Sequence, residues 1–243
     1  MAKLRTNKIE QNMLHFADHD LDDEFMGVAV LLNDNGSPKH SGLVLCYEGE
    51  KLFFHFTSEE VLLDDVTENA EDIYYKKIDL FPDIYLPYIR AHFDLLLETV
   101  KPEYGFVFTD SFYNDFGNYI SDIEDLPDFC TCVGFCINVI RSLLLNNPKY
   151  LEIDDWKNES LEKVNETFIN YVDNYLTLVS KFKPEKLDEV KAATYKRITP
   201  LELLISGFFA KPKKIPVRKS DIDPEISDTR RILKQKWIAT GDS

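Results

Sequence analysis

Three short apolar runs near the start of the chain constrain its fold more than any other feature. They read EFMGVAVLL, HSGLVLCY and KLFFHFT, and they lie between Glu24 and Thr57. The first two are joined by NDNGSPK, in which Asn-Gly readily adopts positive φ, and the last two by the short link EGE. Apolar runs of this length between turn residues predict consecutive β-strands. We therefore expect an antiparallel meander from about Glu24 to Thr57.

The segments on either side of the meander mix helical and strand patterns. The opening polar segment, up to about Asp23, predicts a short helix or arm, and SEEVLLDDV predicts a short helix capped by Ser58. DIYYKKIDL and YGFVFTD predict strands. LPYIRAHFDLLLETV and TCVGFCINVIRSLLL carry apolar residues at helical spacing, so each predicts a helix. The fold class that follows is α+β, with an antiparallel sheet packed on helices.

The last third of the chain differs in character and divides it into two expected parts. Residues 158–183 alternate charged and apolar groups at helical spacing, and TPLELLISGFF opens with Thr199 as N-cap and Pro200 at the first helical position. The final 30 or so residues predict a loosely held tail with a short terminal helix. We therefore predict a module at 1–155 and a helical C-terminal extension with its tail at 156–243. Deletion of 215–243 is expected to leave a folded protein.

The charge and the termini restrict the classes of partner. The 243 residues carry a formal net charge of −15, which repels phosphate backbones, so a nucleic-acid partner is not expected. A basic protein suits such a surface better. The sequence shows no secretory leader and no apolar run long enough to cross a membrane, which predicts a cytoplasmic protein, although secretion by a route without a signal peptide stays open.

Two histidines and a cysteine form the candidate catalytic set. His40 opens the second predicted strand and His55 closes the third, so antiparallel pairing should bring the two imidazoles side by side. Cys132 lies where the second helix should begin, and the positive end of a helix favours a thiolate. The backbone N–H of Cys132 could hold an oxyanion at the same helix end. These parts suit acyl chemistry at a thiol.

The residues around this set resemble a known superfamily. TCVGFCIN is similar to the Asp-Cys-Ser-Gly-Phe motif of NlpC-type papain-like cysteine peptidases and to the Asn-Cys-Glu-His-Phe motif of lecithin:retinol acyltransferase-like proteins. HSGLVL followed by LFFHF resembles the His-x-Gly-Ile-x strand and its polar partner in the same superfamily. The histidines precede the cysteine, which is the order of its circularly permuted branch. The resemblance covers roughly Glu24 to Leu145.

The resemblance implies a permuted papain-like fold and a role for each residue of the set. Cys132 would be the nucleophile, His40 the general base and His55 the third, orienting residue, with no cofactor and no metal. Thr131 and Val133 depart from the polar residues that usually flank the nucleophile, which leans toward an apolar acyl group. The implied activity is that of a cysteine hydrolase or acyltransferase that acts through a thioester on an amide, peptide or lipid ester.

Several alternatives to this interpretation remain open. Cys130, Cys132 and Cys136 with a histidine have the ligand types of a zinc site, although the spacing is not that of common zinc knuckles. His15 and His19 would share a helix face and could bind a metal with Asp18 or Asp20. The aromatic stretch 104–119 could be a cleft wall or plain packing. The whole chain could also be a catalytically silent interaction or immunity-type protein on the same fold.

Overall fold

A six-stranded sheet forms the centre of this computed structural model, which describes residues 4, 6–67, 72–156, 189–190, 193 and 196–241. The strand order is β1-β6-β2-β3-β4-β5, and each neighbouring pair is antiparallel. The strands are β1 (Leu14–His15), β2 (Phe25–Leu32), β3 (Pro38–Tyr47), β4 (Glu50–Phe56), β5 (Val61–Asp65) and β6 (Ile73–Lys77). The α+β class and the predicted meander, β2 to β4, are confirmed.

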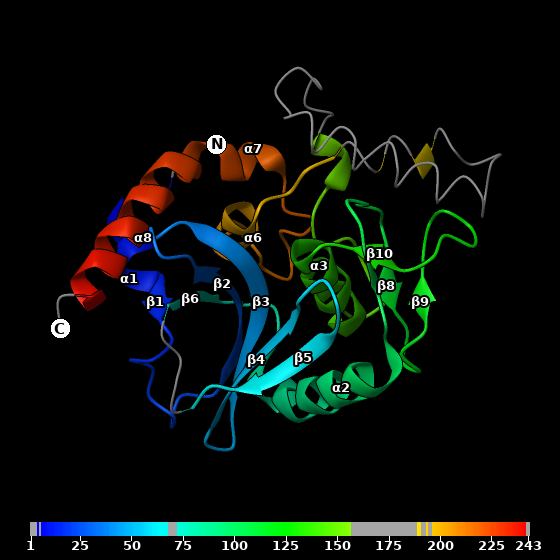
Figure 1. Ribbon diagram of the computed structural model, residues 1–243, viewed down its shortest axis with the longest axis horizontal. Coiled ribbons are helices and arrows are strands. Elements are labelled where there is room, and N and C mark those ends of the chain that lie inside the picture. Colours follow the sequence, from blue (N-terminus) through cyan, green and yellow to red (C-terminus); the bar gives the residue numbers. More distant parts are fainter. Residues whose placement is uncertain are drawn as a thin grey trace.

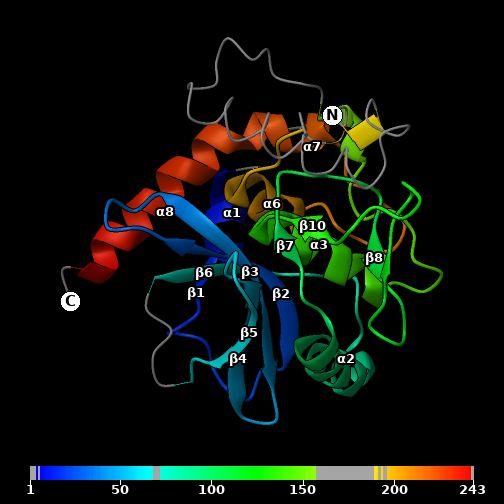
Figure 2. The same ribbon diagram turned by 45° about the vertical axis from the view of Figure 1, so that its right-hand side comes forward.

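Helices and small ladders surround this sheet (Figures 1 and 2). The helices are α1 (Thr6–Asn12), η1 (Asp83–Tyr85), α2 (Leu86–Thr99), α3 (Cys132–Leu143), η2 (Ile153–Asp155), α6 (Pro200–Ser206), α7 (Lys219–Ile222), η5 (Asp223–Glu225) and α8 (Ile226–Gly241). Two further ladders pair β7 (Glu103–Tyr104) with β10 (Phe129–Cys130) and β8 (Phe112–Tyr113) with β9 (Tyr119–Ile120). Among the described residues, no helix has both the length and the apolar character needed to cross a membrane.

Both faces of the central strands are buried, which explains why the runs read as almost continuously apolar. Leu43 and Leu45 of β3 belong to a core cluster that also contains residues of α2, α3 and α6. Val44 and Cys46 point to the opposite face and pack with Phe16 and other aromatic side chains. Successive side chains of a strand alternate between faces, so one strand supplies both cores. In Figure 1, α2, α3 and α6 lie along the same side of the sheet.

Capping residues fix the beginnings of α3 and α6. The Thr131 hydroxyl accepts a hydrogen bond from the Gly134 N–H at 3.2 Å, so α3 begins at Cys132. Ten of the twelve residues of α3 are buried, so it packs as a core helix. Thr199 and Glu202 form a capping box at the start of α6, where Pro200 occupies the first turn. The predicted helix and its Thr199 cap are confirmed.

Two predicted elements are wrong in type or extent. SEEVLLDDV contains strand β5 rather than a helix, because the free edge of β4 gains a hydrogen-bonded partner there, with His55 opposite Leu62. Of the strand predicted for YGFVFTD, only Tyr104 lies in a strand, as the second residue of β7. Its continuation leaves the ladder: the Gly105 N–H still donates to the Cys130 carbonyl, but the Phe108 N–H donates to the carbonyl of Ala193.

The C-terminal residues are part of the core rather than a loosely held tail. Ile232 and Leu233 of α8 are buried in a cluster with Val30 and Leu32 of the central sheet. Trp237 lies so close to the turn before β3 that a Cβ on Gly36 would be 2.6 Å from its ring. The apolar face of α8 therefore needs the sheet, and removal of 215–243 should expose this cluster. The prediction of a loosely held tail is therefore wrong, because α8 is packed in the core.

Residues on the two sides of the expected boundary between 1–155 and 156–243 pack against each other. The Tyr150 and Ser206 hydroxyls share a hydrogen bond at 2.7 Å, and Leu201, Leu203 and Ile205 share the cluster that contains α3. The helical pattern predicted for 158–183 lies outside the described residues.

The packing of α8 gives a stability prediction. Leu233→Ala should lower the free energy of unfolding by about 2–5 kcal/mol, because it leaves a cavity beneath the sheet. Lys234→Ala is the matched control, since Lys234 is exposed one residue further along the same helix. Denaturant unfolding of the two variants measures the difference. Equal stability of Leu233→Ala and the parent protein would show that α8 is dispensable.

Candidate active site

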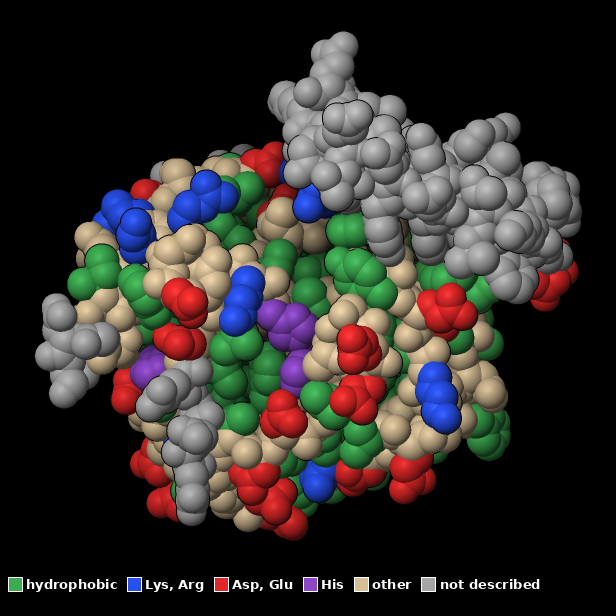
Figure 3. Space-filling model, in the orientation of Figure 1, with side chains coloured by type: hydrophobic (Ala, Val, Ile, Leu, Met, Phe, Trp, Pro, Cys, Tyr) green, Lys and Arg blue, Asp and Glu red, His purple; other side chains and the backbone are tan. Residues whose placement is uncertain are grey.

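His40 and His55 lie side by side, as their strand positions predict. The ladder between β3 and β4 runs from Tyr47 opposite Glu50 to Leu43 opposite Phe54. Beyond its end, His40 Nε2 and His55 Nδ1 are 2.8 Å apart and share a hydrogen bond. Figure 3 shows histidine side chains at the centre of one face of the molecule, over the region where Figure 1 places β3, β4 and α3.

Asp64 extends this pair into a chain of three groups. His55 Nε2 lies 2.9 Å from Asp64 Oδ2, and Asp64 belongs to the edge strand β5. An ionised carboxylate only accepts hydrogen bonds, so His55 carries its proton on Nε2 and accepts on Nδ1. His40 must then donate through Nε2, which leaves its Nδ1 as a free basic nitrogen. Sequence analysis missed Asp64 because its segment was read as a helix.

An aromatic ring supports both imidazoles. The Phe53 ring stacks on His55 with centroids 4.6 Å apart, and it meets the ring of His40 edge-on at 6.3 Å. The same ring lies across Gly42, where a Cβ would approach Phe53 Cε2 to 2.2 Å. The glycine of the HSG segment is therefore required for the position of Phe53. A larger residue at position 42 would displace the Phe53 ring and, with it, the two imidazoles that pack on that ring.

The Cys132 thiol sits at the first residue of α3, half-buried and surrounded by backbone N–H groups. Burial raises its pKa, and hydrogen bonds from the amides of Ser41, Val133 and Cys132 itself lower it by less. The net pKa is above the ordinary value, so the expected thiolate at the helix start is wrong for the resting protein. Desolvation outweighs the helix terminus at this position.

The thiol meets β3 at the residue that follows His40. Ser41 and Leu43 alternate onto the face that packs against α3, whereas His40 and Gly42 alternate onto the opposite face with Val44. In the described part of the chain, no hydrogen bond joins the thiol to either imidazole. The structure thus joins His40 to His55 directly, and joins Cys132 to this pair through the backbone of Ser41.

His40 is uncharged at neutral pH. Burial is the main cause that lowers its pKa to about 4, and the neighbouring His55 and Lys39 act in the same direction. A neutral imidazole can accept a proton, as a general base must. The resting site therefore holds a neutral thiol and a neutral base rather than a thiolate–imidazolium pair.

The other three cysteines differ from Cys132 in that their side chains are fully buried. Cys46, Cys130 and Cys136 are buried, and burial raises the pKa of each thiol. All four cysteines are free. Within the described ranges, no group of three or more cysteine, histidine or acidic side chains could hold a metal ion. The zinc alternative for Cys130, Cys132 and Cys136 therefore finds no support in the geometry.

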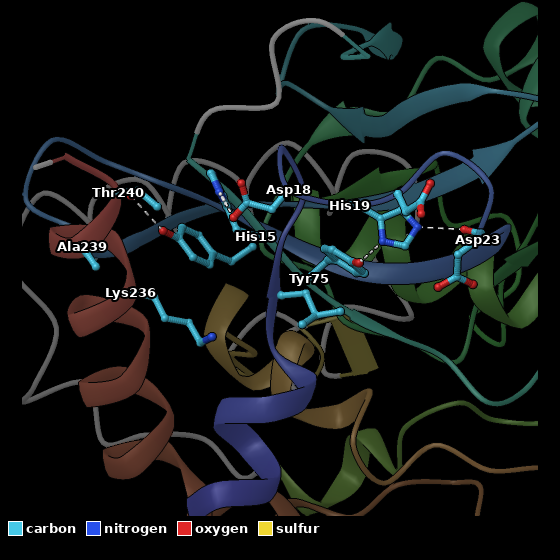
Figure 4. Close-up of a pocket in the computed structure, with 11 residues that line it drawn as sticks. His15, Asp18, His19, Asp23, Tyr75, Lys236, Ala239 and Thr240 are labelled. Carbon is cyan, nitrogen blue, oxygen red and sulfur yellow. Dashed lines mark hydrogen bonds and ion pairs between the residues drawn. The ribbon is translucent and has the colours of Figure 1, made fainter. Parts of the chain in front are cut away.

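His15 and His19 border a separate cavity of about 360 Å³ between the N-terminal segment and α8 (Figure 4). Both ring nitrogens of His19 are occupied, because Nδ1 lies 2.7 Å from the Tyr75 hydroxyl and Nε2 2.8 Å from the carbonyl of Asp23. His15 Nδ1 lies instead 3.2 Å from an Asp18 oxygen. The two rings therefore face different partners, and the metal-binding alternative for this pair is not supported.

The aromatic stretch 104–119 serves two purposes. Its start lies beside the beginning of α3, since Tyr104 pairs with Cys130 in the ladder of β7 and β10, and burial raises the pKa of the Tyr104 phenol. Its middle packs under α3, where the Tyr113 N–H donates to the Ser142 hydroxyl at 2.8 Å. Tyr104 is thus the residue of this stretch that pairs with β10, two residues before Cys132.

Comparison with protein-family models finds none that matches this chain, and comparisons with curated proteins and with solved structures likewise find no match. The arrangement of the site therefore carries the functional argument.

The low pKa of His40 predicts how the site affects stability. The unfolded chain binds a proton at the ordinary pKa of 6.5, whereas the folded protein binds it only near 4. The unfolded state therefore holds more protons between these values, and stability falls as the pH is lowered from 6.5 to 4.

His40→Gln should remove that part of the pH dependence. The measurement is denaturant unfolding of both proteins at pH 7 and pH 4.5, taken as the difference between variant and parent. His92→Gln is the positive control. Burial lowers the pKa of His92 to about 4 as well, so this substitution outside the site should change the pH dependence of stability in the same direction. A parent–variant difference that is independent of pH would mean that His40 is not desolvated.

Proposed function

We propose that this protein is a cysteine-dependent hydrolase or acyltransferase with a permuted papain-like fold. The observation that carries the proposal is the chain Asp64–His55–His40, which leaves His40 with a free basic nitrogen on the strand that the Cys132 thiol contacts. A nucleophile at a helix start, a base and groups that orient the base are the parts of thiol acyl chemistry.

The reaction would proceed in two half-reactions. Because His40 alternates onto the other face of β3, the proposal requires the Cys132 side chain to leave the Ser41 amide and come within reach of His40 Nδ1 at the end of the strand. The sulfur then gives its proton to His40 Nδ1 and attacks the substrate carbonyl carbon. The oxyanion accepts hydrogen bonds from backbone N–H groups at the start of α3. Collapse expels the leaving group, which takes the proton from His40, and a thioester remains on Cys132. Water or an acceptor alcohol or amine then gives a proton to His40, attacks the thioester and restores the thiol.

The surroundings of the thiol favour an acyl group with apolar character. Val133 is buried directly after the nucleophile, and Tyr104 and Phe106 supply aromatic surface nearby. The proposed substrates are accordingly amides, peptides or lipid esters. A cytoplasmic location is part of the same proposal.

An interaction protein without catalysis is the second candidate, and an exposed apolar cavity favours it. The cavity measures about 650 Å³ and lies between η1, the first turn of α2 and the end of α3. Ile84 and Leu145 on its rim are each 83% exposed. Asp115 also lines it, and the chain carries a net charge of −15, so the matching partner would be a basic protein with apolar anchors.

Replacement of the nucleophile tests the first proposal. Cys132→Ser should abolish turnover of a 4-nitrophenyl ester, by at least about a thousandfold, while stability stays nearly unchanged. Intact-protein mass spectrometry of the parent should show an acyl adduct that maps to Cys132. Cys130→Ser and Cys136→Ser are the matched controls and should turn over normally. An adduct on another cysteine, or activity in Cys132→Ser, would refute the assignment.

Asp64 should act on the rate through His55. Asp64→Asn replaces an obligate acceptor by an amide that can present a donor, so the polarity of the chain is no longer fixed. We expect kcat to fall by about tenfold or more with little change in KM. Asp65→Asn is the matched control on the same strand. Equal kcat values for the two variants would show that Asp64 does not orient the imidazoles.

A further inference from the structure

The cavity of about 360 Å³ that His15 borders lies away from the candidate active site (Figure 4). Its lining comes from β1, the turn that follows β1, β6 and α8. In the strand order of the sheet, β1 and β6 lie at one end, whereas β5, which carries Asp64, lies at the other. The cavity is therefore a separate site, and its volume matches that of pockets for small organic molecules.

Paired aromatic side chains form the floor of this cavity. The His15 ring stacks on Tyr74 with centroids 4.9 Å apart. The Tyr74 hydroxyl lies 3.3 Å from the Thr240 hydroxyl of α8, and the Tyr75 hydroxyl lies 2.7 Å from His19 Nδ1. Both tyrosines are buried, and both phenols have partners within the protein. The floor is thus held in place before any ligand binds, which lowers the cost of ordering it on binding.

Charged side chains of both signs line the same cavity. Asp18 is 78% exposed and accepts a hydrogen bond from His15 Nδ1 at 3.2 Å, which fixes its carboxylate at the rim. Asp20 lies in the same turn, and Lys236 reaches the cavity from α8 (Figure 4). In the described part of the chain, no ion pair joins Lys236 to either carboxylate. Opposite charges that border one cavity without pairing favour a ligand that carries both charges.

His15 also brings an unpaired acceptor to this wall. Its Nε2 is buried and has no hydrogen-bond partner among the described residues. Because the Asp18 carboxylate only accepts, Nδ1 carries the proton, and Nε2 of the neutral ring is an acceptor. A buried acceptor without a donor is unfavourable. The wall at His15 therefore favours the positively charged, N–H-bearing end of a ligand.

We propose that this cavity binds a small zwitterion, an α-amino acid with an apolar or aromatic side chain. Its ammonium group would lie at Asp18 and Asp20, beside the His15 ring, and its carboxylate would pair with Lys236. A ligand with only one charge would leave the opposite charge of the lining without a partner. The inference does not depend on the proposed function, because no residue of this cavity belongs to the candidate active site.

Three matched probes test the inference on the full chain. L-phenylalanine carries both charges, 2-phenylethylamine only the ammonium and 3-phenylpropanoate only the carboxylate, each on the same phenyl group. Isothermal titration calorimetry at neutral pH should give an affinity for L-phenylalanine at least about tenfold higher than for either analogue. Saturating L-phenylalanine should also raise the denaturant midpoint of unfolding. Equal or tighter binding of either analogue, or binding of none of the three probes, would overturn the proposal.

Variants assign the two charges of the ligand to their partners. Asp18→Asn and Lys236→Gln should each weaken the binding of L-phenylalanine by about tenfold. Asp18→Asn should not weaken 3-phenylpropanoate, and Lys236→Gln should not weaken 2-phenylethylamine. Asp22→Asn and Lys234→Gln are the matched controls, since both residues are exposed neighbours outside the lining. Weakening of L-phenylalanine by the controls as well, or by none of the four substitutions, would contradict the assignment.

His15→Phe tests the anchoring of Asp18 without emptying the wall. Phenylalanine keeps a flat ring on Tyr74 and removes both ring nitrogens. The variant should therefore stay folded, because the Nε2 that it loses has no partner among the described residues. Its affinity for L-phenylalanine should fall by about threefold or more, since Asp18 is no longer held at the rim. A folded His15→Phe variant with the affinity of the parent would refute the role given to His15.

Discussion

The burial of β3 on both faces is the constraint on which the candidate site depends. Leu43 and Leu45 are fixed under α3, and Val44 and Cys46 are fixed in the opposite core. A shift of one residue along the strand would exchange these faces, at the cost of both cores. The positions of His40 and Ser41 relative to the start of α3 follow from this register. Apolar side chains that take no part in the proposed chemistry therefore determine where the candidate catalytic groups lie.

The order of the groups in the site follows from the cost of burying charge. Asp64 lies on the edge strand with 48% of its side chain exposed, whereas the side chain of His55 is 9% exposed. The member of the chain that carries a full negative charge is therefore the one that water can solvate. Burial keeps His40 uncharged, and each ring nitrogen between His40 Nε2 and Asp64 has one hydrogen-bond partner. The sheet edge thus supplies polarity to a buried site without burying an ion.

Local patterns predicted the parts of this structure that depend on few residues. The meander, α2, α3 and the Thr199 cap could all be predicted from the sequence, because strand alternation, helical spacing and capping depend on neighbouring residues. The proximity of His40 and His55 followed from a tight turn. The strand β5 and its Asp64 were not predictable in this way, since VLLDD becomes a strand only by pairing with β4. The burial of α8 likewise depends on Val30 and Leu32, about two hundred residues earlier.

The charge state of Cys132 shows why the motif alone could not define the chemistry. A helix terminus stabilises a thiolate by about 0.3–1 kcal/mol, whereas burial can shift a pKa by several units. Burial therefore prevails while the sulfur faces the Ser41 amide. An imidazolium about 4 Å from a thiolate would contribute about 4 kcal/mol at an effective dielectric constant of 20, enough to reverse that balance. Under the proposed function, ionisation of the thiol would be tied to its movement from the Ser41 amide to His40, and the site would become reactive in the same step that brings nucleophile and base together.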